Sequence, residues 1–171
     1  MADNFYCSIE IVKGFYPNHI WEFLNTLGDF KESENTYFYS KDAPNGQLDE
    51  LEEFLIRQGI PFDRNSKGFC EIEPELRVYR PGLIDQVIIK NNDGYSYVPT
   101  DSLREVLSMK TSLSEIVDRI STLVEEVEPS YPELISYRIM WGKSDSKELF
   151  EPNATIEDRN IHVVAVLNDV L

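Results

Sequence analysis

Hydrophobic and polar residues alternate along residues 5–12, which is the pattern of a strand with one buried side. From Asn18 to Gly28 the apolar residues instead recur every three or four positions, which predicts a helix. Asn18 is expected to cap the start of this helix and Gly28 to end it. The inward side chains are Phe5, Cys7, Ile9 and Ile11 in the strand and Ile20, Phe23, Leu24 and Leu27 in the helix.

An aromatic run at residues 37–39 predicts a short strand, and the Pro-Asn-Gly sequence at 44–46 predicts a turn after it. A second helix is expected to end at Gly59, with an apolar side formed by Leu48, Leu51, Phe54 and Leu55. Its first turns hold Asp49, Glu50, Glu52 and Glu53. The helix dipole favours acids there by about 0.3–1 kcal/mol each. Glu52 and Glu53 are expected to project into solvent.

Short alternating runs return over residues 69–97, with prolines at 74 and 81 between them. The sequence Asn-Asn-Asp-Gly at 91–94 lies between two β-like runs, 87–89 and 95–98. Asparagine and glycine accept the left-handed backbone of a tight turn, so this arrangement predicts a hairpin. The region is expected to form the meander of a sheet.

Two further helices are predicted by capping boxes, in which a serine and a glutamate three residues later satisfy each other's backbone N–H groups. The first box is Ser102 and Glu105, and the second is Ser112 and Glu115. The helix after the second box has the most regular apolar stripe in the chain, formed by Leu113, Ile116, Val117, Ile120, Leu123, Val124 and Val127.

Two late strands are predicted at residues 134–141 and 161–167, with a loop of 19 residues between them. The second is apolar almost throughout, which favours a central position covered on both faces. No repeat or linker divides the chain, so residues 1–171 are expected to form a single α+β domain. Its sheet is predicted to be mixed or mostly antiparallel, with the helices on one face, and a ferredoxin-like elaboration is the nearest named architecture.

The chain carries 31 acidic and 16 basic residues, a net charge of -15, whereas a magnitude of about 2–8 keeps a small domain soluble. A first acidic segment, residues 29–53, has eight acids and two bases, a net charge of -6: Asp29, Glu32, Glu34, Asp42, Asp49, Glu50, Glu52 and Glu53. A second acidic segment, residues 112–133, has six acids and one base, a net charge of -5: Glu115, Asp118, Glu125, Glu126, Glu128 and Glu133. These segments hold most of the excess charge.

Residues with catalytic or metal-binding chemistry form no recognisable pattern. His19 and His162 lack triad partners, Cys7 falls on the apolar side of a strand, and no CxxC pair or phosphate-binding glycine motif is present. Basic residues around Arg64 and Arg77 are expected to pair internally with Glu71, Glu73 and Glu75. We therefore expect no catalytic residue, metal or cofactor. The first residues lack a signal-peptide pattern and no run is long enough to span a membrane, so a cytoplasmic protein is expected.

Direct nucleic-acid binding is disfavoured, because phosphate groups would repel this chain. The leading hypothesis is a non-enzymatic binding protein that inhibits a basic, nucleic-acid-handling protein by presenting carboxylates in place of phosphates. In size and charge the chain resembles small DNA-mimic inhibitors of restriction or CRISPR systems and nuclease-immunity proteins. The expected contacts are the acids of the first segment, Glu115, Asp118, Glu125, Glu126 and Glu128 of the second, and exposed Tyr37 and Tyr39 as anchors.

Three other readings remain open. The chain is also consistent with a small enzyme or ligand-binding domain in which the acidity is incidental, and with an adaptor subunit in which an exposed apolar patch matters more. Acidity can also reflect the proteome of the host organism. One continuous acidic patch would favour the inhibitor, whereas a buried carboxylate pair in a cleft would favour an enzyme. The oligomeric state is left open.

Overall fold

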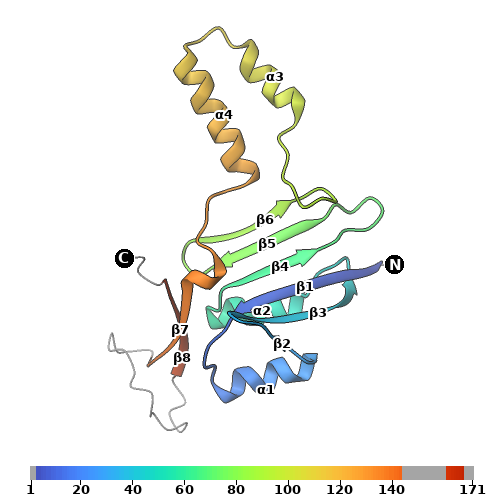
Figure 1. Cartoon of the computed structure of the whole chain (residues 1–171), viewed down its shortest axis with the longest axis vertical. Helices are drawn as coiled ribbons and strands as arrows, with labels where there is room; N and C mark the ends of the chain where they lie inside the picture. The colour runs from blue at the N-terminus through green and yellow to red at the C-terminus, as the bar shows by residue number, and fades with distance from the viewer. Residues whose placement is uncertain (1–2, 144–160, 168–171) are drawn as a thin grey trace.

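The computed structural model describes residues 3–143 and 161–167, and its main feature is a six-stranded sheet (Figure 1). The strand order is β2-β3-β1-β4-β5-β6, and every neighbouring pair is antiparallel. The strands are β1 Asn4–Val12, β2 Lys31–Glu32, β3 Thr36–Pro44, β4 Phe62–Ser66, β5 Glu75–Arg80 and β6 Ile84–Ile89. This confirms the predicted α+β class. The first four strands, with one helix between β1 and β2 and another between β3 and β4, follow the β-α-β-β-α-β order of a ferredoxin-like sheet, in which β3 lies between β1 and β2 and β1 lies between β3 and β4. Strands β5 and β6 extend this sheet, in agreement with the expected ferredoxin-like elaboration.

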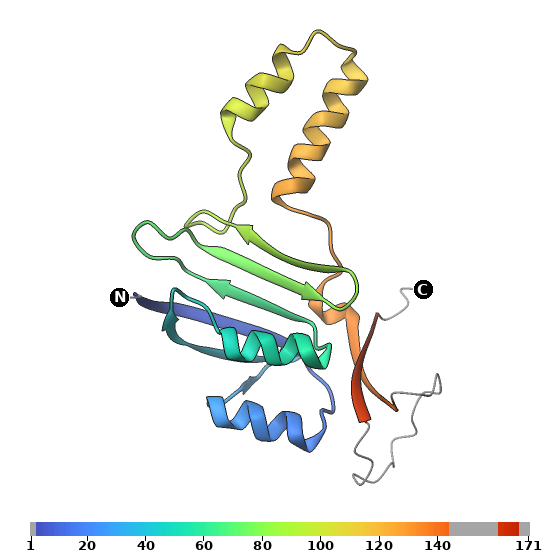
Figure 2. The same ribbon diagram turned by 180° about the vertical axis from the view of Figure 1, so that it is seen from behind.

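Two helices cover one face of this sheet. They are α1, Asn18–Leu27, and α2, Asp49–Gln58, and Figure 2 shows α2 lying in front of the strands. The core between helices and sheet is built from alternate residues of β1, as the strand pattern predicted, with apolar residues of both helices against them. Fully buried members are Cys7, Ile9, Ile11, Ile20, Leu24, Leu55, Ile60 and Phe62. Apolar burial of this kind is the main driving force for the fold.

Strand β4 was not predicted, and its register explains why. It pairs with β1 so that Phe62, Arg64 and Ser66 lie opposite Ile11, Ile9 and Cys7. Arg64 and Ser66 are therefore buried although they are polar. A strand whose buried side carries an arginine and a serine does not show the usual apolar alternation.

The hairpin predicted at residues 91–94 is wrong. Strand β6 pairs with β5, through the turn at 81–83, and residues 95–98 form no strand. The 91–94 segment does turn, because the Asn91 side chain accepts hydrogen bonds from the backbone N–H groups of Asp93 and Tyr95. Turn chemistry was therefore predicted correctly, but the chain that follows leads to a helix instead of returning to the sheet.

The two capping boxes have different outcomes. Helix α4, Leu113–Val127, begins at Ser112 with both hydrogen bonds of the box, as predicted. Helix α3, Thr100–Ser108, begins directly after Pro99, so Ser102 lies inside the helix and caps nothing. A similar error applies at α1, where Asn18 was predicted as the cap but is the first helical residue, and Pro17 occupies the cap position. Proline has a φ suited to a helix start, and at both sites it places the first helical residue earlier than the side-chain pattern indicated.

The last two strands form a separate antiparallel pair, β7 Tyr137–Lys143 and β8 Ile161–Leu167, after a short 3-10 turn at Leu134–Ser136. Strand β8 has the predicted bounds, whereas β7 begins three residues later than predicted, because residues 134–136 form the 3-10 turn, and ends two residues later. The central position expected for β8 is wrong, because within the described residues β8 pairs with β7 alone. An apolar run does not specify how many neighbours a strand has. Most of the predicted loop, residues 144–160, lies outside the described residues.

The turn after β3 requires glycine at its second position. Asn45 and Gly46 have φ values of 52° and 64°, as the Pro-Asn-Gly signal predicted. A Cβ at Gly46 would overlap the Ser66 hydroxyl and the Phe5 ring. We expect Gly46→Ala to lower the free energy of unfolding by about 1–3 kcal/mol, through overlap in addition to backbone strain.

Urea unfolding of Gly46→Ala beside Gly94→Ala measures the overlap separately. Gly94 has a φ of 85° but open space around its Cβ position. Its alanine variant therefore reports backbone strain without overlap, and we expect the smaller loss there. Equal losses for both variants would contradict the packing proposed for Gly46.

Candidate interaction surface

The two acidic segments lie at different places in the fold. The first includes β2, β3 and α2, and the second lies mainly on α4. Strands β2 and β6 are the opposite edges of the sheet, and α4 extends beyond the β6 edge (Figure 1). The segments therefore do not form the single continuous patch that would have favoured mimicry over the whole surface.

Most of the predicted acids are exposed, as expected. In the first segment these are Asp29, Glu32, Glu34, Asp42, Asp49, Glu50 and Glu53, and in the second they are Glu115, Asp118, Glu125, Glu126, Glu128 and Glu133. Within the part of the chain that the structure describes, four of them have local partners. Glu32 pairs with Lys13, Glu128 pairs with Lys90, Glu115 accepts the hydrogen bonds of the Ser112 cap, and Glu125 accepts hydrogen bonds from the Ser130 backbone N–H and hydroxyl. The others face solvent without a basic side chain in ion-pair contact.

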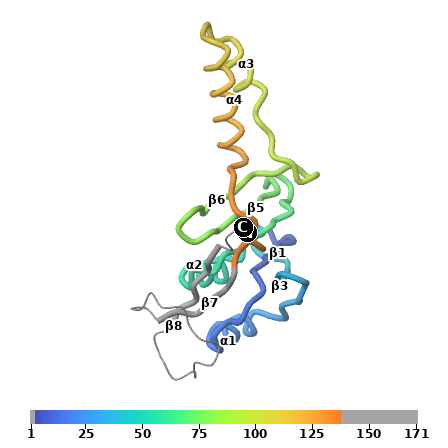
Figure 3. Tube along the Cα trace, turned by 60° about the vertical axis from the view of Figure 1, so that its left-hand side comes forward, coloured from blue at the N-terminus to red at the C-terminus, as the bar shows by residue number. Residues whose placement is uncertain are grey.

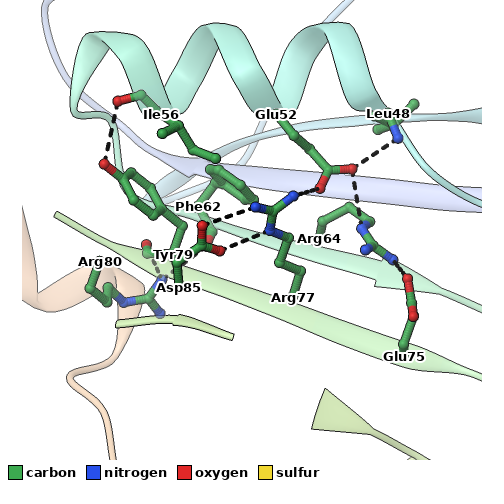
Figure 4. A network of polar contacts seen from close by, with 10 residues as sticks. All are labelled: Leu48, Glu52, Ile56, Phe62, Arg64, Glu75, Arg77, Tyr79, Arg80 and Asp85. Atoms are coloured by element: carbon green, nitrogen blue, oxygen red, sulfur yellow. Dashed lines mark hydrogen bonds and ion pairs between the residues drawn. The ribbon is translucent and has the colours of Figure 1, made fainter. Parts of the chain in front are cut away.

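Glu52 is the exception, and its predicted exposure is wrong. Its side chain lies between α2 and the sheet, with 1% of the residue exposed. One carboxylate oxygen accepts a hydrogen bond from the Leu48 backbone N–H at 2.9 Å and lies 3.3 Å from Arg64 Nε (Figure 4). The other oxygen accepts a hydrogen bond from Arg77 Nη1 at 2.9 Å. Glu52 therefore joins α2 to strands β4 and β5 and is unavailable to a partner.

The two arginines continue this network along the sheet (Figure 4). Arg64, buried on β4, also donates to Glu75, and Arg77 makes two hydrogen bonds of 2.9 Å to Asp85. Hydrogen bonds to Asp85 raise the pKa of Arg77 above its usual range, with a smaller contribution from Glu52. Forked arginine-carboxylate contacts of this kind fix geometry as well as charge. The internal pairing predicted for the basic cluster is confirmed, although Glu75 is the one neighbouring glutamate among the three that takes part.

A second buried arginine, Arg80, fixes the segment after α4. It is fully buried and donates to the Asp63 carboxylate, to the Phe62 carbonyl at 3.0 Å and to the Pro132 carbonyl at 2.8 Å. Its guanidinium also lies near the Tyr131 and Tyr137 rings. Arg80 therefore connects the end of β5 to the polypeptide that leads away from the helical part of the molecule.

The two tyrosines predicted as exposed anchors belong to the core region. Tyr39 is buried, stacks on Phe30 and donates its hydroxyl hydrogen to the Leu27 carbonyl at 2.8 Å. Tyr37 is half-buried and packs edge-on against Trp21. This expectation is wrong because Tyr37 and Tyr39 share one face of β3, and α1 with the loop after it covers that face. Neither ring is presented as a projecting anchor.

The cysteines and His19 form no reactive group. Cys7 lies in the core, as predicted, and burial raises the pKa of its thiol to about 12. A thiol with so high a pKa is a poor nucleophile at neutral pH. Cys70 and His19 are exposed at separate places, and the side chain of His162 lies outside the described residues. In the described part of the chain, no three His, Cys, Asp or Glu side chains gather as a metal site requires.

An open groove of about 370 Å³ lies between the loops that follow β4 and β6. The one carboxylate among the described residues of its lining, Glu73, accepts a hydrogen bond from the Tyr97 hydroxyl at 2.5 Å, and Lys90 contacts Glu128 outside the groove, whereas Lys67, Cys70 and Asn92 also line it. The hydrogen bond to Glu73 raises the pKa of Tyr97. An enzyme site requires acidic and basic groups that converge on a free position, and this groove does not provide that arrangement.

Helices α3 and α4 form a hairpin that extends beyond the β6 edge, away from α1 and α2 (Figures 1 and 3). The predicted stripe of α4 partly packs against α3, yet no residue of α4 is buried. The stripe was expected to cover a core, but the sheet does not reach it. Among the described residues, no helix has the length and apolar character needed to cross a membrane.

Two hydrogen-bonded glutamates make the stability of this hairpin depend on pH. Backbone and hydroxyl hydrogen bonds from Ser112 lower the pKa of Glu115, and the hydrogen bond from Lys90 lowers the pKa of Glu128. A lowered pKa means that the ionised form stabilises the fold. This stabilisation is complete above the usual glutamate pKa of 4.5 and is lost as pH falls below it.

We therefore expect α3 and α4 to lose helical structure below pH 4.5, with Glu115 and Glu128 titrating below that value. Carboxyl carbon NMR shifts and helix content, followed over the same pH series, check this. In the double variant Glu115→Gln and Glu128→Gln, the loss of helix content at low pH that these two carboxylates cause should disappear. An unchanged pH profile in that variant would show that other groups cause the loss.

Comparison with protein-family models, with curated proteins and with solved structures finds no match to this chain. The function proposed below is therefore based on the charge, burial and packing of its own residues.

Proposed function

We propose that the protein is a non-enzymatic acidic binding protein that engages a basic protein. The observation that carries this proposal is the exposure of the acids. Nine of them, Asp29, Glu34, Asp42, Asp49, Glu50, Glu53, Asp118, Glu125 and Glu126, face solvent and make no ion pair among the described residues. Self-repulsion among such groups opposes folding, and a basic partner would relieve it while being steered toward them.

The positions of three arginines also support a basic partner. Arg64, Arg77 and Arg80 are the arginines nearest the centre of the sheet, and all three are held in internal ion pairs. These three of the 16 basic residues are therefore used inside the protein, whereas the acids of the two segments, apart from Glu52, lie on its surface. A partner that binds this surface would need lysine and arginine side chains of its own.

In the finer form of the proposal, the partner handles nucleic acid in the cytoplasm and the carboxylates occupy its phosphate-binding groove. The position of the acidic segments at different ends of the sheet adds a requirement. The partner's phosphate-binding groove would contact one acidic segment at a time. Inhibition would therefore require the carboxylates of that segment, and it would persist when the acids of the other segment are neutralised. The enzyme alternative draws no support from the buried carboxylate, because Glu52 lies between two arginines and not beside a second carboxylate.

Neutralising each segment separately tests the proposal. The first variant combines Asp49→Asn, Glu50→Gln and Glu53→Gln, and the second combines Asp118→Asn, Glu125→Gln and Glu126→Gln; both change the net charge equally. Immobilised wild-type protein should capture a basic protein from lysate of the source organism at low salt and release it at high salt. One variant should lose this capture, and adding nucleic acid should displace the partner. Identical capture by all three proteins would contradict the proposal.

A further inference from the structure

The α3–α4 hairpin presents large apolar side chains to solvent at its outer surface. On α4 the exposed fractions are 76% for Leu113, 52% for Val117 and 48% for Val124, and on α3 the value is 64% for Leu107. Two helices packed only on each other leave one side of their apolar surface uncovered. Isolated surface valines or leucines are common, but a contiguous group of them marks an interaction site.

The spacing of these residues places them on one line along α4. Successive helical residues are about 100° apart around the axis, so Leu113, Val117 and Val124 fall within an arc of about 40°. The half-buried residues that face α3, Ile116, Ile120, Leu123 and Val127, occupy the adjoining arc. Leu113, Val117 and Val124 therefore form the edge of the apolar stripe that α3 leaves uncovered.

The side of this line away from α3 is polar and acidic. Ser121 and Ser114 fall about 80° and 100° from Leu113, and Glu128, Glu125 and Asp118 fall about 60°, 120° and 140° from it by the same spacing; all are exposed. Arg119, the one basic residue of α4, lies about 120° away in the opposite direction. An apolar ridge with an acidic border on its open side is complementary to a surface that combines apolar and basic side chains.

Electrostatic repulsion argues against the other molecules or segments that could cover this apolar line. A second copy of the hairpin would bring the same acids against one another, in a chain of net charge -15. Residues 144–160 hold five acids and two bases, a net charge of -3, so this segment would also be repelled. An anionic membrane or a nucleic acid meets the same repulsion. A basic protein segment remains.

We infer that the α3–α4 hairpin binds a basic amphipathic helix of a partner protein, which packs as a third helix along Leu113, Val117 and Val124. Its apolar side covers the ridge, and its lysines or arginines reach Asp118 and Glu125. Amphipathic helices commonly bind by placing residues at spacings of three and four into an apolar surface. This inference rests on the proposed function and assigns the second acidic segment as the contact.

A designed helical peptide tests this assignment on the full-length protein. The probe is an 18-residue peptide of leucine and lysine with its leucines on one helical face. A scrambled peptide of the same composition and a leucine-glutamate peptide with the same apolar face are its controls. Labelled-peptide anisotropy gives the affinities, and backbone amide NMR shifts locate the contact. We expect shift changes on α3 and α4 and binding of the amphipathic lysine peptide at least about tenfold tighter than either control.

Three variants make the test specific, and two of them carry the same change of charge at different places. Leu113→Ser, Val117→Ser and Val124→Ser together should weaken binding at least about tenfold, as loss of central apolar contacts does. Asp118→Asn with Glu125→Gln should weaken it several-fold, whereas Glu34→Gln with Asp42→Asn, the same change of charge elsewhere, should not. Circular dichroism confirms that each variant keeps its helices.

Other outcomes would overturn the inference. These are equal binding of the scrambled peptide, shift changes on β2, β3 and α2 in place of the hairpin, or unaltered affinity in the serine variant. None of these outcomes would decide whether the protein captures a basic protein at low salt, because the capture experiment measures that separately. Failure of that capture, with the hairpin contact intact, would instead show that the hairpin binds a partner of another kind.

Discussion

Replacing Glu52 by glutamine is expected to lower the free energy of unfolding by about 3 kcal/mol, because removing one member of a buried ion pair leaves its partner charge without compensation. Arg64 is almost fully buried, and Arg77 is three-quarters covered. Glutamine keeps the size of the side chain and its acceptor oxygen for the Leu48 N–H, so the change isolates the charge. Urea unfolding followed by circular dichroism measures the loss.

The neighbouring residue provides a matched control. Glu53 lies on the same turn of α2 but is exposed, so Glu53→Gln is expected to change stability by less than about 0.5 kcal/mol. The two variants have the same net charge and the same chemical substitution. If Glu52→Gln unfolds at the same urea concentration as Glu53→Gln, the network in Figure 4 does not hold α2 on the sheet.

Replacing Arg80 by alanine is expected to cost about 3–5 kcal/mol. The arginine side chain is fully buried and satisfies three backbone carbonyls, those of Phe62, Tyr79 and Pro132, as well as the Asp63 carboxylate. Alanine would leave all four acceptors without this donor, and it would leave a cavity under Tyr131 and Tyr137. Thermal and urea unfolding measure this loss.

Arg80→Lys separates charge from geometry. Lysine keeps the positive charge but lacks the planar fork that reaches Asp63 and Pro132 together. We expect its stability to lie between those of wild type and Arg80→Ala. Arg104→Ala removes an exposed arginine that pairs with Asp101 on α3, and a change under about 1 kcal/mol is expected there. Equal stability of Arg80→Lys and wild type would show that charge alone matters at this position.

Arg80 also helps to hold the proposed interaction surface, the α3–α4 hairpin, in place. Arg80 binds the Pro132 carbonyl, four residues after the last ion-paired residue of the hairpin region, Glu128. Lys90 binds Glu128 from the end of β6. Both contacts attach the end of α4 to the sheet, which would limit the freedom that a binding partner must remove.

Much of the local structure was predictable because its signals lie within a few residues. The alternation in β1 and the Ser112 capping box each depend on neighbours in the sequence, and both elements form as expected. The acids of the second segment were also correctly expected to be exposed, since they lie off the apolar stripe of α4. Local pattern failed where proline set the start of a helix, as at Pro99, or where a turn led to a helix, as after Asn91.

The candidate site was less predictable because exposure depends on what packs above a residue. Glu52 and Glu53 are adjacent acids on one helix, but one faces Arg64 and the other faces solvent. The nearest sequence signal was the spacing of Glu52 from Leu48, which places it beside the apolar side of α2. Tyr39 likewise shares an aromatic run with Tyr37, and its burial follows from the position of α1 and Phe30.

The sequence by itself determined the α+β class, the strand of residues 5–12, the helices that end at Gly59 and begin at Ser112, and the excess of acid. Periodicity, caps and composition act locally or sum over the chain, so no tertiary contact is needed to read them. Only the tertiary structure decided that Glu52 is neutralised by two arginines, that the acids divide between different ends of the sheet, and that the stripe of α4 stays partly uncovered. Those outcomes depend on which distant elements meet, because burial and ion pairing are properties of contacts between segments remote in sequence.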